Sequence, residues 1–408
     1  MISISAFKAL RPQPQFACEV ASRPYDVLNV KEAKTESEGK PYSFLHITRS
    51  EIDLPVNVDV HSQEVYTKAK ENLNAFIGRG ILFTEDKPCY YIYQLEMDGR
   101  SQVGLVCCSS VDDYENGLIK KHEFTRPEKE KDRIDHIFNT QAQTGNVFLA
   151  YRDVEELNDL IGIWKNSKSP VYNFTSDDGI RHSVWVVNNE KTIDRITELF
   201  KTEVPCTYIA DGHHRVASAS KVKYMLPDNE EAGHFLCTLF PASQLHIYDY
   251  NRVVTDLNGY TPEQLLEKLD RDFSITKLTK AYKPDQPHHF GMYLKGTWYE
   301  LVTLEGTFAT DPVNVLDISI LQNNILEPFF DIKDQRTDPR IDFVGGIRGM
   351  EELEKRVDSG EAMVAFSVFP VTIEQLFDIA DTNQIMPPKS TWFEPKLRDG
   401  LLTHLINE

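Results

Sequence analysis

The chain of 408 residues is predicted to fold as an α+β protein with mixed sheets. First, segments rich in β-branched and aromatic residues alternate with amphipathic segments of helical period. Second, several strand-like segments are joined by Asp-Gly or Lys-Gly pairs, which are typical of hairpins and therefore indicate antiparallel pairing. Third, 41% of the residues are hydrophobic and 26% are charged, as in ordinary globular proteins.

Chain length bounds the number of hydrophobic cores. Single cores stop growing beyond roughly 250–300 residues, so the chain is expected to divide into domains. We expect an N-terminal α+β region over 1–140, a central region over 141–258 and a C-terminal α+β region over 259–408. The clearest linker-like stretch is Lys-Pro-Asp-Gln-Pro at 283–287. The sequence contains no internal repeat and no low-complexity tract.

The N-terminal region contains three readable elements. Residues 42–49 alternate between apolar and polar side chains, which predicts a strand. Residues 63–77 carry apolar side chains at helical spacing and are followed by a glycine, which predicts a helix. The strand-like segments 89–95 and 102–108 flank Asp98-Gly99, so they predict a hairpin.

The central and C-terminal regions mix the two kinds of element. In the central region we expect strands at 146–151, 182–187, 234–240 and 246–254 and helices at 154–164 and 191–200. In the C-terminal region we expect a hairpin of 290–294 with 297–304. Helices are expected to start at 261 and to span 312–326, 350–358 and 372–381. Strands are expected over 341–344 and 362–369.

The densest group of polar functional residues follows a strand-like segment at 207–210. The sequence Asp211-Gly212-His213-His214-Arg215 leads into an alanine-rich stretch, which predicts a strand, a turn and a helix. A helix N-terminus suits a phosphate or carboxylate because its N–H groups are unpaired and partly positive. Gly212 permits close approach of a ligand, and Asp211 can cap the helix. An anion site and a plain helix cap with solvated side chains both fit these residues.

Two further polar stretches precede this turn. His122 adjoins Glu123, and a histidine beside a carboxylate is a common acid–base or metal-binding pair. Adjacent residues on a strand point to opposite faces, however, so the two need not share a site. Asp26 lies in Arg-Pro-Tyr-Asp-Val at 23–27, where it is either a turn acceptor or a site carboxylate.

The third informative stretch is 386–396. Its two prolines exclude a helix and hold the backbone extended. An ammonium group and two hydroxyls follow, and a second lysine lies close behind, at Lys389, Ser390, Thr391 and Lys396. These groups suit phosphate oxygens, but the glycine-rich lead-in of a P-loop is absent. A rigid exposed loop with an incidental lysine is the alternative.

The charge balance restricts the partners. The chain carries 63 acidic and 44 basic residues, for a formal net charge of −19. Such a surface repels polyphosphate backbones, so we expect neither nucleic acid nor anionic membranes as partners. An anion site must therefore be a local basic pocket. No segment approaches the ~20 apolar residues of a membrane span.

The cysteines and the N-terminus indicate a cytoplasmic protein. The six cysteines lack C-x-x-C spacing, and most lie in apolar, strand-like surroundings. They are therefore expected to be reduced core residues and not a disulfide framework or zinc site. The first residues lack the apolar run and cleavage site of a signal peptide. The oligomeric state is not indicated.

These stretches together resemble a bacterial and archaeal family of unknown function, DUF1015. The matching pieces are 23–27, 122–125, 210–215 and 386–396 with Gly400, in the family's order and over almost the whole chain. The Asp-Gly-His-His-Arg sequence also resembles the signature of the ParB/sulfiredoxin-like fold found in ADP-dependent free serine kinases. The resemblance therefore implies a ParB/sulfiredoxin-like core around this turn, with additional α+β regions.

The family pattern departs from this chain at one segment. Members often carry Pro-Thr-His-Arg where this chain reads Asp249-Tyr250-Asn251-Arg252. Only the arginine is kept, so no site role is carried over to this segment.

The resemblance implies that Asp211, His213, His214 and Arg215 handle phosphate. A transferring phosphoryl group needs positioning and positive charge more than covalent help. We therefore expect an enzyme of phosphoryl transfer on a small hydroxylated metabolite, with serine or phosphoserine favoured and ATP or ADP as the nucleotide. The sequence does not separate a kinase from a phosphatase.

The expected roles divide the candidate residues into three groups. The catalytic group is Asp211, His213 and Glu123, with Asp211 as a ligand for Mg²⁺, His213 as a proton shuttle and Glu123 as the general base. The phosphate- or nucleotide-binding group is Gly212, His214, Arg215, Lys389, Ser390, Thr391 and Lys396. Additional candidates are Asp26 and His122.

Two other functions remain open on these residues. One is a nucleotide-binding regulatory switch of ParB-like type without metabolic turnover, whose ligand is also a small molecule. The other is a metal-dependent hydrolase that uses His122, Glu123, His213 and His214. We rank the hydrolase last because no His-x-x-x-His spacing on a helix supports it.

Overall fold

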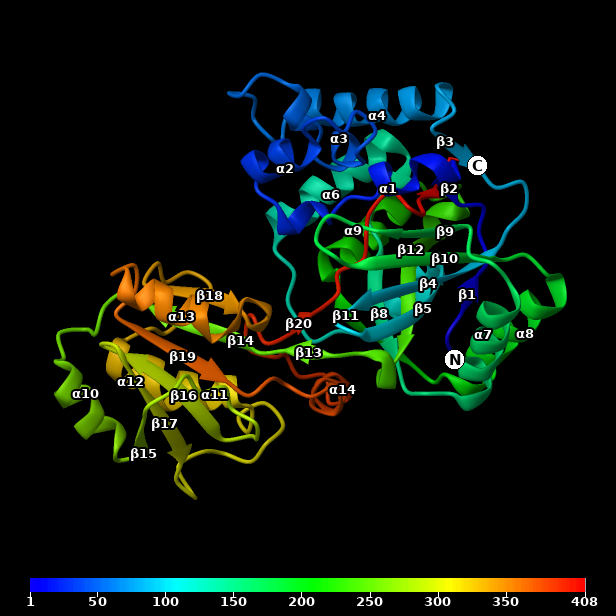
Figure 1. Cartoon of the computed structure of the whole chain (residues 1–408). Helices are drawn as coiled ribbons and strands as arrows, with labels where there is room; N and C mark the ends of the chain where they lie inside the picture. Colours follow the sequence, from blue (N-terminus) through cyan, green and yellow to red (C-terminus); the bar gives the residue numbers. More distant parts are fainter. Residues whose placement is uncertain (408) are drawn as a thin grey trace. The chain divides into compact units, whose positions relative to one another are not determined.

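The computed structural model describes residues 1–407 and divides into two compact units. Unit 1 comprises Met1–Leu245 together with the C-terminal segment from Pro395 onward, and unit 2 comprises His246–Glu394. Both units combine helices with sheets, which confirms the α+β class. Figure 1 traces the course of the chain through each unit.

The borders of these units differ from the three regions expected from the sequence. The expected border after residue 140 lies inside unit 1, because one sheet takes strands from both sides of it. The expected border after residue 258 is replaced by one after Leu245, because β14 (Tyr250–Val254) pairs with two strands of unit 2. The residues from Pro395 onward return to unit 1.

Unit 1 is built on a nine-stranded mixed sheet. Its strand order is β6 (Ile119–Lys120), β11 (Thr207–Asp211), β8 (Val147–Tyr151), β12 (His234–Pro241), β5 (Arg100–Ser110), β4 (Tyr90–Met97), β10 (Arg181–Val187) and β9 (Tyr172–Thr175), with β1 (Ile4–Ser5) paired to β5. The β11–β6 and β12–β8 pairs are parallel, and the others are antiparallel. The sheet supplies most of the largest apolar cluster of the unit.

Several predicted elements of unit 1 are present close to their expected bounds. They are the β4–β5 hairpin, α4 (Gln63–Gly78), α7 (Glu155–Ser167), α8 (Glu190–Glu203) and α9 (His213–Met225). Further helices are α1 (Ala17–Val20), α2 (Val30–Ser37), α5 (Val111–Glu115) and α6 (Pro127–Thr140). The amphipathic stripe of α4 explains its prediction, because Val65, Ala69, Leu73 and Phe76 are all buried.

The strand predicted at 42–49 is wrong. This segment forms the short helix α3 (Leu45–Thr48) and a 3-10 turn over Ser50–Asp53. Phe44 and Ile47, three residues apart, both pack into the same apolar cluster, as one helical turn allows. The alternating pattern was therefore too short to separate a strand from a single helical turn.

The C-terminal segment is integrated into unit 1. Ser22 and Asp399 form a backbone bridge, with both N–H···O distances between 3.0 and 3.1 Å. Further along, β21 (His404–Leu405) pairs with β7 (Ala142–Gln143). In Figure 1 this red segment runs beside the blue N-terminal elements α1 and β2 (Leu10–Pro12).

Unit 2 is built on a six-stranded antiparallel sheet. Its strand order is β15 (Phe273–Leu278), β17 (Thr297–Thr303), β16 (His289–Leu294), β19 (Val364–Val368), β14 and β18 (Ile341–Gly345). A separate ladder pairs β13 (Ile247–Tyr248) with β20 (Trp392–Phe393). The helices are α10 (Pro262–Leu269), α11 (Asp317–Leu321), α12 (Glu327–Phe330), α13 (Gly349–Asp358) and α14 (Ile373–Asp381).

Two predicted elements of unit 2 differ in detail. The strand expected at 246–254 is split into β13 and β14, which pair with different partners. The helix expected at 312–326 begins only at Asp317 and continues as a π-helical segment over Gln322–Leu326. Asp311 accepts hydrogen bonds from the N–H groups of Val313 and Asn314, and this local turn delays the start of the helix.

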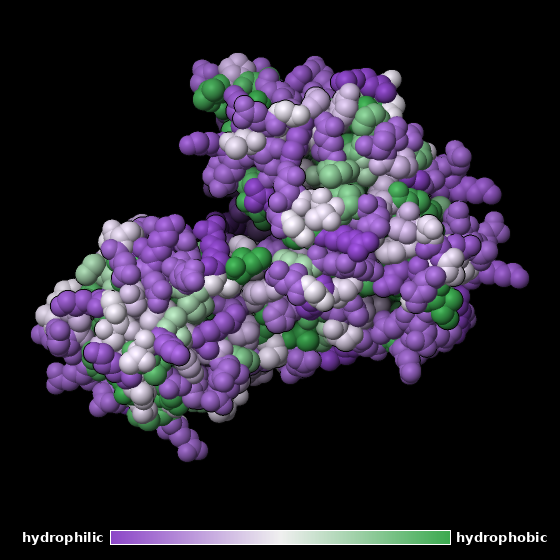
Figure 2. All heavy atoms as spheres, viewed as in Figure 1, coloured by the Kyte–Doolittle hydropathy of each residue, from purple (hydrophilic) through white to green (hydrophobic). Residues whose placement is uncertain are grey.

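The exterior is hydrophilic over most of what is visible. Figure 2 shows polar residues over the greater part of the visible face of each unit, with apolar residues in small separate patches. Within residues 1–407, the helices are all too short or too polar to cross a membrane. All six cysteines are free thiols, and four of them are buried.

Candidate functional site

The candidate site of unit 1 is built on the predicted strand–turn–helix. β11 ends at Asp211, Gly212 follows with φ 97° and ψ 27°, and α9 begins at His213. A side chain at this left-handed conformation would be strained, which explains the glycine. Gly212 is the N-cap of α9, and no side chain caps this end of the helix. The expected capping role of Asp211 is therefore wrong.

Asp211 instead binds a lysine of the C-terminal segment. Lys396 Nζ donates to Asp211 Oδ2 at 2.7 Å. The side chains are partly accessible, with 38% of Asp211 and 19% of Lys396 exposed. Burial alone would raise the pKa of Asp211, but Lys396 and Arg215 outweigh it and hold this pKa well below its usual range. The carboxylate is therefore ionised at all physiological pH values.

Arg215 is held by a carboxylate from the N-terminal segment. One nitrogen, Nη2, donates to Asp26 Oδ1 at 3.1 Å, and Nη1 donates to the carbonyl of Asn146. Burial disfavours the charged form, yet Asp26 and Asp399 raise the pKa of Arg215 above its ordinary value. Within the described chain, Arg215 Nε has no hydrogen-bond partner. The guanidinium thus keeps one donor, Nε, that has no protein acceptor and is itself buried.

The Tyr25 ring contacts two guanidinium groups. The Arg133 guanidinium carbon lies 3.8 Å from the Tyr25 ring centroid and that of Arg215 lies 5.4 Å from it. Such contacts orient the planar cations over the ring. These side chains line a cavity of about 30 Å³ together with Gly145. A drug-sized ligand needs roughly 300 Å³ or more, so this cavity has room for a few atoms only.

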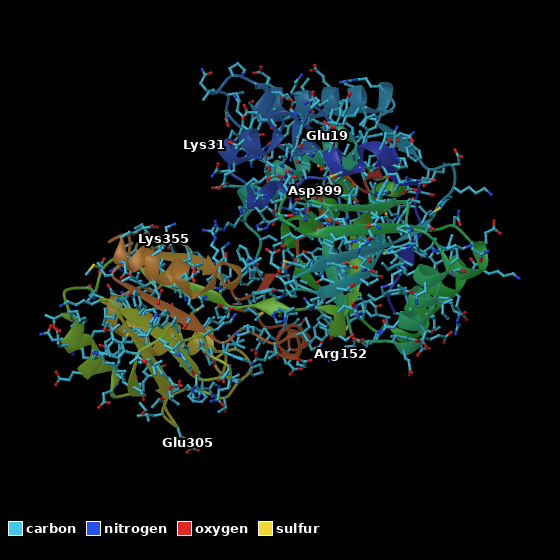
Figure 3. All side chains as sticks on the ribbon, in the orientation of Figure 1. Glu19, Lys31, Arg152, Glu305, Lys355 and Asp399 are labelled. Atoms are coloured by element: carbon cyan, nitrogen blue, oxygen red, sulfur yellow. The ribbon has the colours of Figure 1, made fainter. Side chains whose placement is uncertain are left out.

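Asp399 is a site residue that the sequence predictions missed. Its side chain is 2% exposed, and neither carboxylate oxygen has a partner of good hydrogen-bond geometry in the described chain. Burial raises the pKa of Asp399 to about 7, although Arg215 and Arg133 act against it. Figure 3 shows Asp399 inside unit 1, among other side chains. The only signal in the sequence was an Asp-Gly pair, at 399–400.

His122 and His213 form a buried pair beside the turn. Their ring centroids lie 4.6 Å apart with an interplanar angle of 86°. Burial lowers the pKa of His122 to about 4, against the attraction of Asp211, and burial together with His122 lowers the pKa of His213 well below its ordinary value. His213 is therefore neutral at physiological pH, which disfavours its expected role as a proton shuttle. His122 Nδ1 and His213 Nε2 have no hydrogen-bond partner among the described residues.

His214 is engaged by a backbone group outside this pair. His214 Nε2 accepts a hydrogen bond from the Arg126 N–H at 2.9 Å, just before α6. This nitrogen is therefore engaged as an acceptor, and burial lowers the pKa of His214, so the imidazole is a poor ligand for a phosphate in this conformation. Glu123 is exposed, and its role as a general base stays a prediction.

The remaining predicted residues belong to unit 2. Lys389 is exposed, with φ 57°, and Thr391 is partly buried. Ser390 is buried, and its hydroxyl donates to the carbonyl of Pro387. That hydrogen bond uses the only proton of the hydroxyl, so Ser390 cannot donate to a phosphate as expected without breaking it. The candidate residues therefore fall into two groups, one in each unit.

The residues do not fit a magnesium ion held by the protein. Across residues 1–407, no three His, Cys, Asp or Glu side chains converge as a metal site. Asp211, the expected ligand, is in contact with the ammonium group of Lys396. Mg²⁺ prefers carboxylate and phosphate oxygens in octahedral geometry, and a bound ammonium competes for the same oxygens. We therefore assign no step of the reaction to a metal.

The fold and the site define a two-unit α+β protein with a cationic cluster at a strand–turn–helix. The chain belongs to the family described as "Protein of unknown function (DUF1015)", whose model matches residues 4–319. No curated protein matches the chain.

Several solved structures are similar to the chain at low sequence identity. A variant of free serine kinase in complex with AMP is 11% identical, with a TM-score of 0.38, and the match covers 73% of this chain and 91% of that one. A conserved hypothetical protein from Pyrococcus furiosus is 14% identical, with a TM-score of 0.36 and coverage of 74% and 95%. SbnI from Staphylococcus aureus, truncated at its C-terminus, is 10% identical, with a TM-score of 0.38 and coverage of 74% and 87%.

At these TM-scores the likeness supports no argument about fold or function. The ParB/sulfiredoxin-like core implied by the Asp-Gly-His-His-Arg sequence therefore stays a prediction. The candidate site rests on the contacts within unit 1.

Proposed function

We propose that the protein transfers a phosphoryl group to or from a small hydroxylated metabolite, with serine or phosphoserine as the favoured substrate. One observation carries the proposal. Two cations from distant parts of the chain, Arg215 and Lys396, converge on the turn that opens α9. Positive charge and an uncapped helix N-terminus are the groups that a phosphoryl group needs for binding and transfer.

Both cations are engaged by carboxylates of the same unit. Asp26 holds Arg215, and Asp211 holds Lys396. A phosphate dianion carries more charge than either carboxylate, so it can replace Asp26 at the guanidinium fork. The partial exposure of Asp26 and Asp211 leaves a path to both cations. Binding of the phosphate therefore exchanges ion pairs and does not create new buried charge.

The transfer itself needs a base for the acceptor hydroxyl. The hydroxyl oxygen forms the new bond to phosphorus, the bond to the leaving oxygen breaks, and its electron pair stays on that oxygen. The hydroxyl proton passes to a carboxylate. Glu123 is the proposed base from sequence, and Asp399 is a second candidate because a pKa of about 7 suits proton transfer near neutral pH.

Incubation of the full chain with Mg²⁺, ATP or ADP, and serine or phosphoserine tests the proposal. Phosphorus NMR then follows the donor and the product. We expect phosphate to move between nucleotide and serine. Conversion of phosphoserine without a nucleotide would identify a phosphatase. Absence of turnover in every mixture, with a nucleotide-dependent rise in melting temperature, would contradict phosphoryl transfer and favour a regulatory switch.

A further inference from the structure

Arg252 of unit 2 is a buried cation whose hydrogen bonds go to neutral groups. The residue lies on β14 and is 0% exposed. Its Nη2 donates to the carbonyls of Lys389 at 3.0 Å and Pro388 at 3.5 Å. Its other donors reach Gln335 Oε1 and the carbonyl of Tyr250. The guanidinium therefore anchors the turn that contains Lys389 to the central sheet of unit 2.

The charge of Arg252 has no described counterion. Burial of an unpaired ion is costly, and here it lowers the pKa of Arg252 to about 10. A buried carboxylate of the same segment, Asp249, is paired with Lys283 at 2.8 Å. The positive charge of Arg252 therefore acts on the peptide groups that bind it.

Two peptide groups of the turn lie against this charge: the one between Lys389 and Ser390, whose carbonyl accepts at 3.0 Å, and the one between Pro388 and Lys389, whose carbonyl accepts more weakly at 3.5 Å. In a trans peptide the N–H points away from the C=O, so the Lys389 N–H is directed away from the guanidinium. Hydrogen bonding at the carbonyl polarises the peptide and strengthens its N–H as a donor. This N–H has no acceptor in the described part of unit 2.

Lys389 adds an exposed ammonium group to the same turn. Its backbone is in the left-handed region, with φ 57°. Its Nζ lies 5.6 Å from the Tyr250 ring centroid, and the Trp392 ring packs edge-on against Tyr250 at 4.9 Å. Trp392 also donates from Nε1 to Glu394 Oε1 at 3.0 Å. These aromatic contacts fix the turn in place and put a fluorescent side chain beside it.

We propose that the turn at 387–390 is a binding site for a phosphate-type oxyanion. In this site the Lys389 N–H and ammonium contact the anion, and Arg252 is a positioning residue beneath them. Ser390 holds the turn closed through Pro387 and does not contact the anion. The identity of the anion as a substrate or nucleotide phosphate rests on the proposed function, whereas the binding of an oxyanion does not.

Inorganic pyrophosphate is a suitable probe. The full chain carrying Arg215→Met and Lys396→Met lacks the two cations of unit 1, so the remaining affinity reports other sites. We expect Lys389→Met in this background to lower pyrophosphate affinity at least about tenfold, measured by calorimetry and by the change in tryptophan fluorescence. Lys295→Met is the matched control, because Lys295 is also exposed in unit 2 with a left-handed φ of 50°. Equal affinities of the Lys389 and Lys295 variants would overturn the proposal.

The role of Arg252 requires a readout that loss of packing alone does not change. We expect Arg252→Gln to lower the affinity about tenfold and to weaken its dependence on salt, because one fixed charge is lost. Arg252→Lys should retain part of the pyrophosphate affinity and part of its dependence on salt. Equal losses in the two variants, with unchanged salt dependence, would show that Arg252 only packs the turn. Where these variants do not fold, the comparison of Lys389 with Lys295 still decides the site.

The same data separate this inference from the proposed function. Pyrophosphate binding that depends on Lys389, together with no phosphoryl transfer by the unmodified chain, would contradict only the proposed function. Phosphoryl transfer together with binding that is insensitive to Lys389 would contradict only the inference.

Discussion

Lys396 Nζ lies 2.7 Å from Asp211 Oδ2, although 185 positions separate the two residues. This ion pair joins the C-terminal segment to the start of α9. It also decides the charge at the turn, because without the ammonium group the partly exposed Asp211 would repel an anion.

Substitution of Lys396 therefore tests the anion site directly. We expect Lys396→Met to lower the affinity for inorganic phosphate about tenfold or more, because a cation is lost and Asp211 is left unpaired. Equilibrium dialysis with labelled phosphate measures the change. Lys40→Met is the control, since Lys40 also pairs with an aspartate, Asp177, in unit 1. An equal loss in both variants would mean that the effect is only one of net charge.

Substitutions of Asp26 and of Arg215 are expected to change phosphate affinity in opposite directions. Arg215→Met removes the guanidinium and should abolish most phosphate binding. Asp26→Asn frees the guanidinium from its competitor and should raise phosphate affinity about fivefold, the equivalent of an exposed ion pair. The control is Asp177→Asn, which removes an exposed carboxylate elsewhere in unit 1. A fall in affinity for Asp26→Asn would show that Asp26 contacts the ligand instead of competing with it.

The raised pKa of Asp399 predicts that the stability of the protein depends on pH. Its folded-state pKa of about 7 lies above the value of ~3.9 for an unfolded aspartate, so the folded state binds the proton more tightly. The contribution of Asp399 is favourable below pH ~4 and is lost as pH rises through about 7, by on the order of 4 kcal/mol at most. Urea unfolding at pH 5 and pH 8 should show this loss in the unmodified chain and a smaller one in Asp399→Asn. The same pH dependence in both would contradict the assignment.

The lowered pKa of His122 predicts the opposite dependence of stability on pH, over a lower pH range. Its pKa of about 4 in the folded state lies below the ~6.5 of an unfolded histidine, so the unfolded state binds the proton more tightly. Stability is therefore lost as pH falls from ~6.5 towards about 4. His122→Gln should reduce this loss, measured by urea unfolding at pH 7 and pH 4.5, and the remainder comes from other buried histidines such as His213. His61→Gln is the control, because His61 lies on the surface of unit 1.

Gly212→Ala tests the strained turn. A side chain at φ 97° should lower the free energy of unfolding by about 1–2 kcal/mol and lower phosphate affinity, because the turn positions Arg215. Gly162→Ala in α7 is the control and should raise stability by about 0.5–1 kcal/mol, since Gly162 lies inside a helix and nothing lies within 4 Å of an added Cβ. Chemical unfolding of both variants measures the difference. Equal effects would mean that the left-handed conformation carries no strain.

The parts of the fold that the sequence predicted are those with local causes. Asp98 and Gly99 have φ 52° and 77°, as the hairpin between β4 and β5 requires, and this pair of residue types is visible in the sequence. The turn at Gly212 between β11 and α9 was likewise predicted from residue types that are adjacent in the sequence. The wrong prediction at 42–49 also came from a local pattern. The alternation of apolar and polar residues there extends over too few residues to exclude a helical turn.

The composition of the site was less accessible from sequence. Asp26 and Arg215 were both candidates, but their pairing across 189 positions depends on the tertiary fold. Asp399 was missed because an aspartate before a glycine usually indicates a solvated turn. Its burial follows from the backbone bridge to Ser22, which no local pattern reveals. The engagement of His214 by the Arg126 N–H is equally non-local.

The return of the chain to unit 1 at Pro395 has a consequence during synthesis. When a ribosome has added residue 394, every residue of unit 2 exists, yet Lys396 and Asp399 have not been made. Asp211 is then without its ammonium partner, and the N-terminal segment is without the residue that bridges Ser22. Premature termination before this point would therefore release a chain that contains every residue of unit 2 but lacks Lys396 and Asp399 of the proposed anion site.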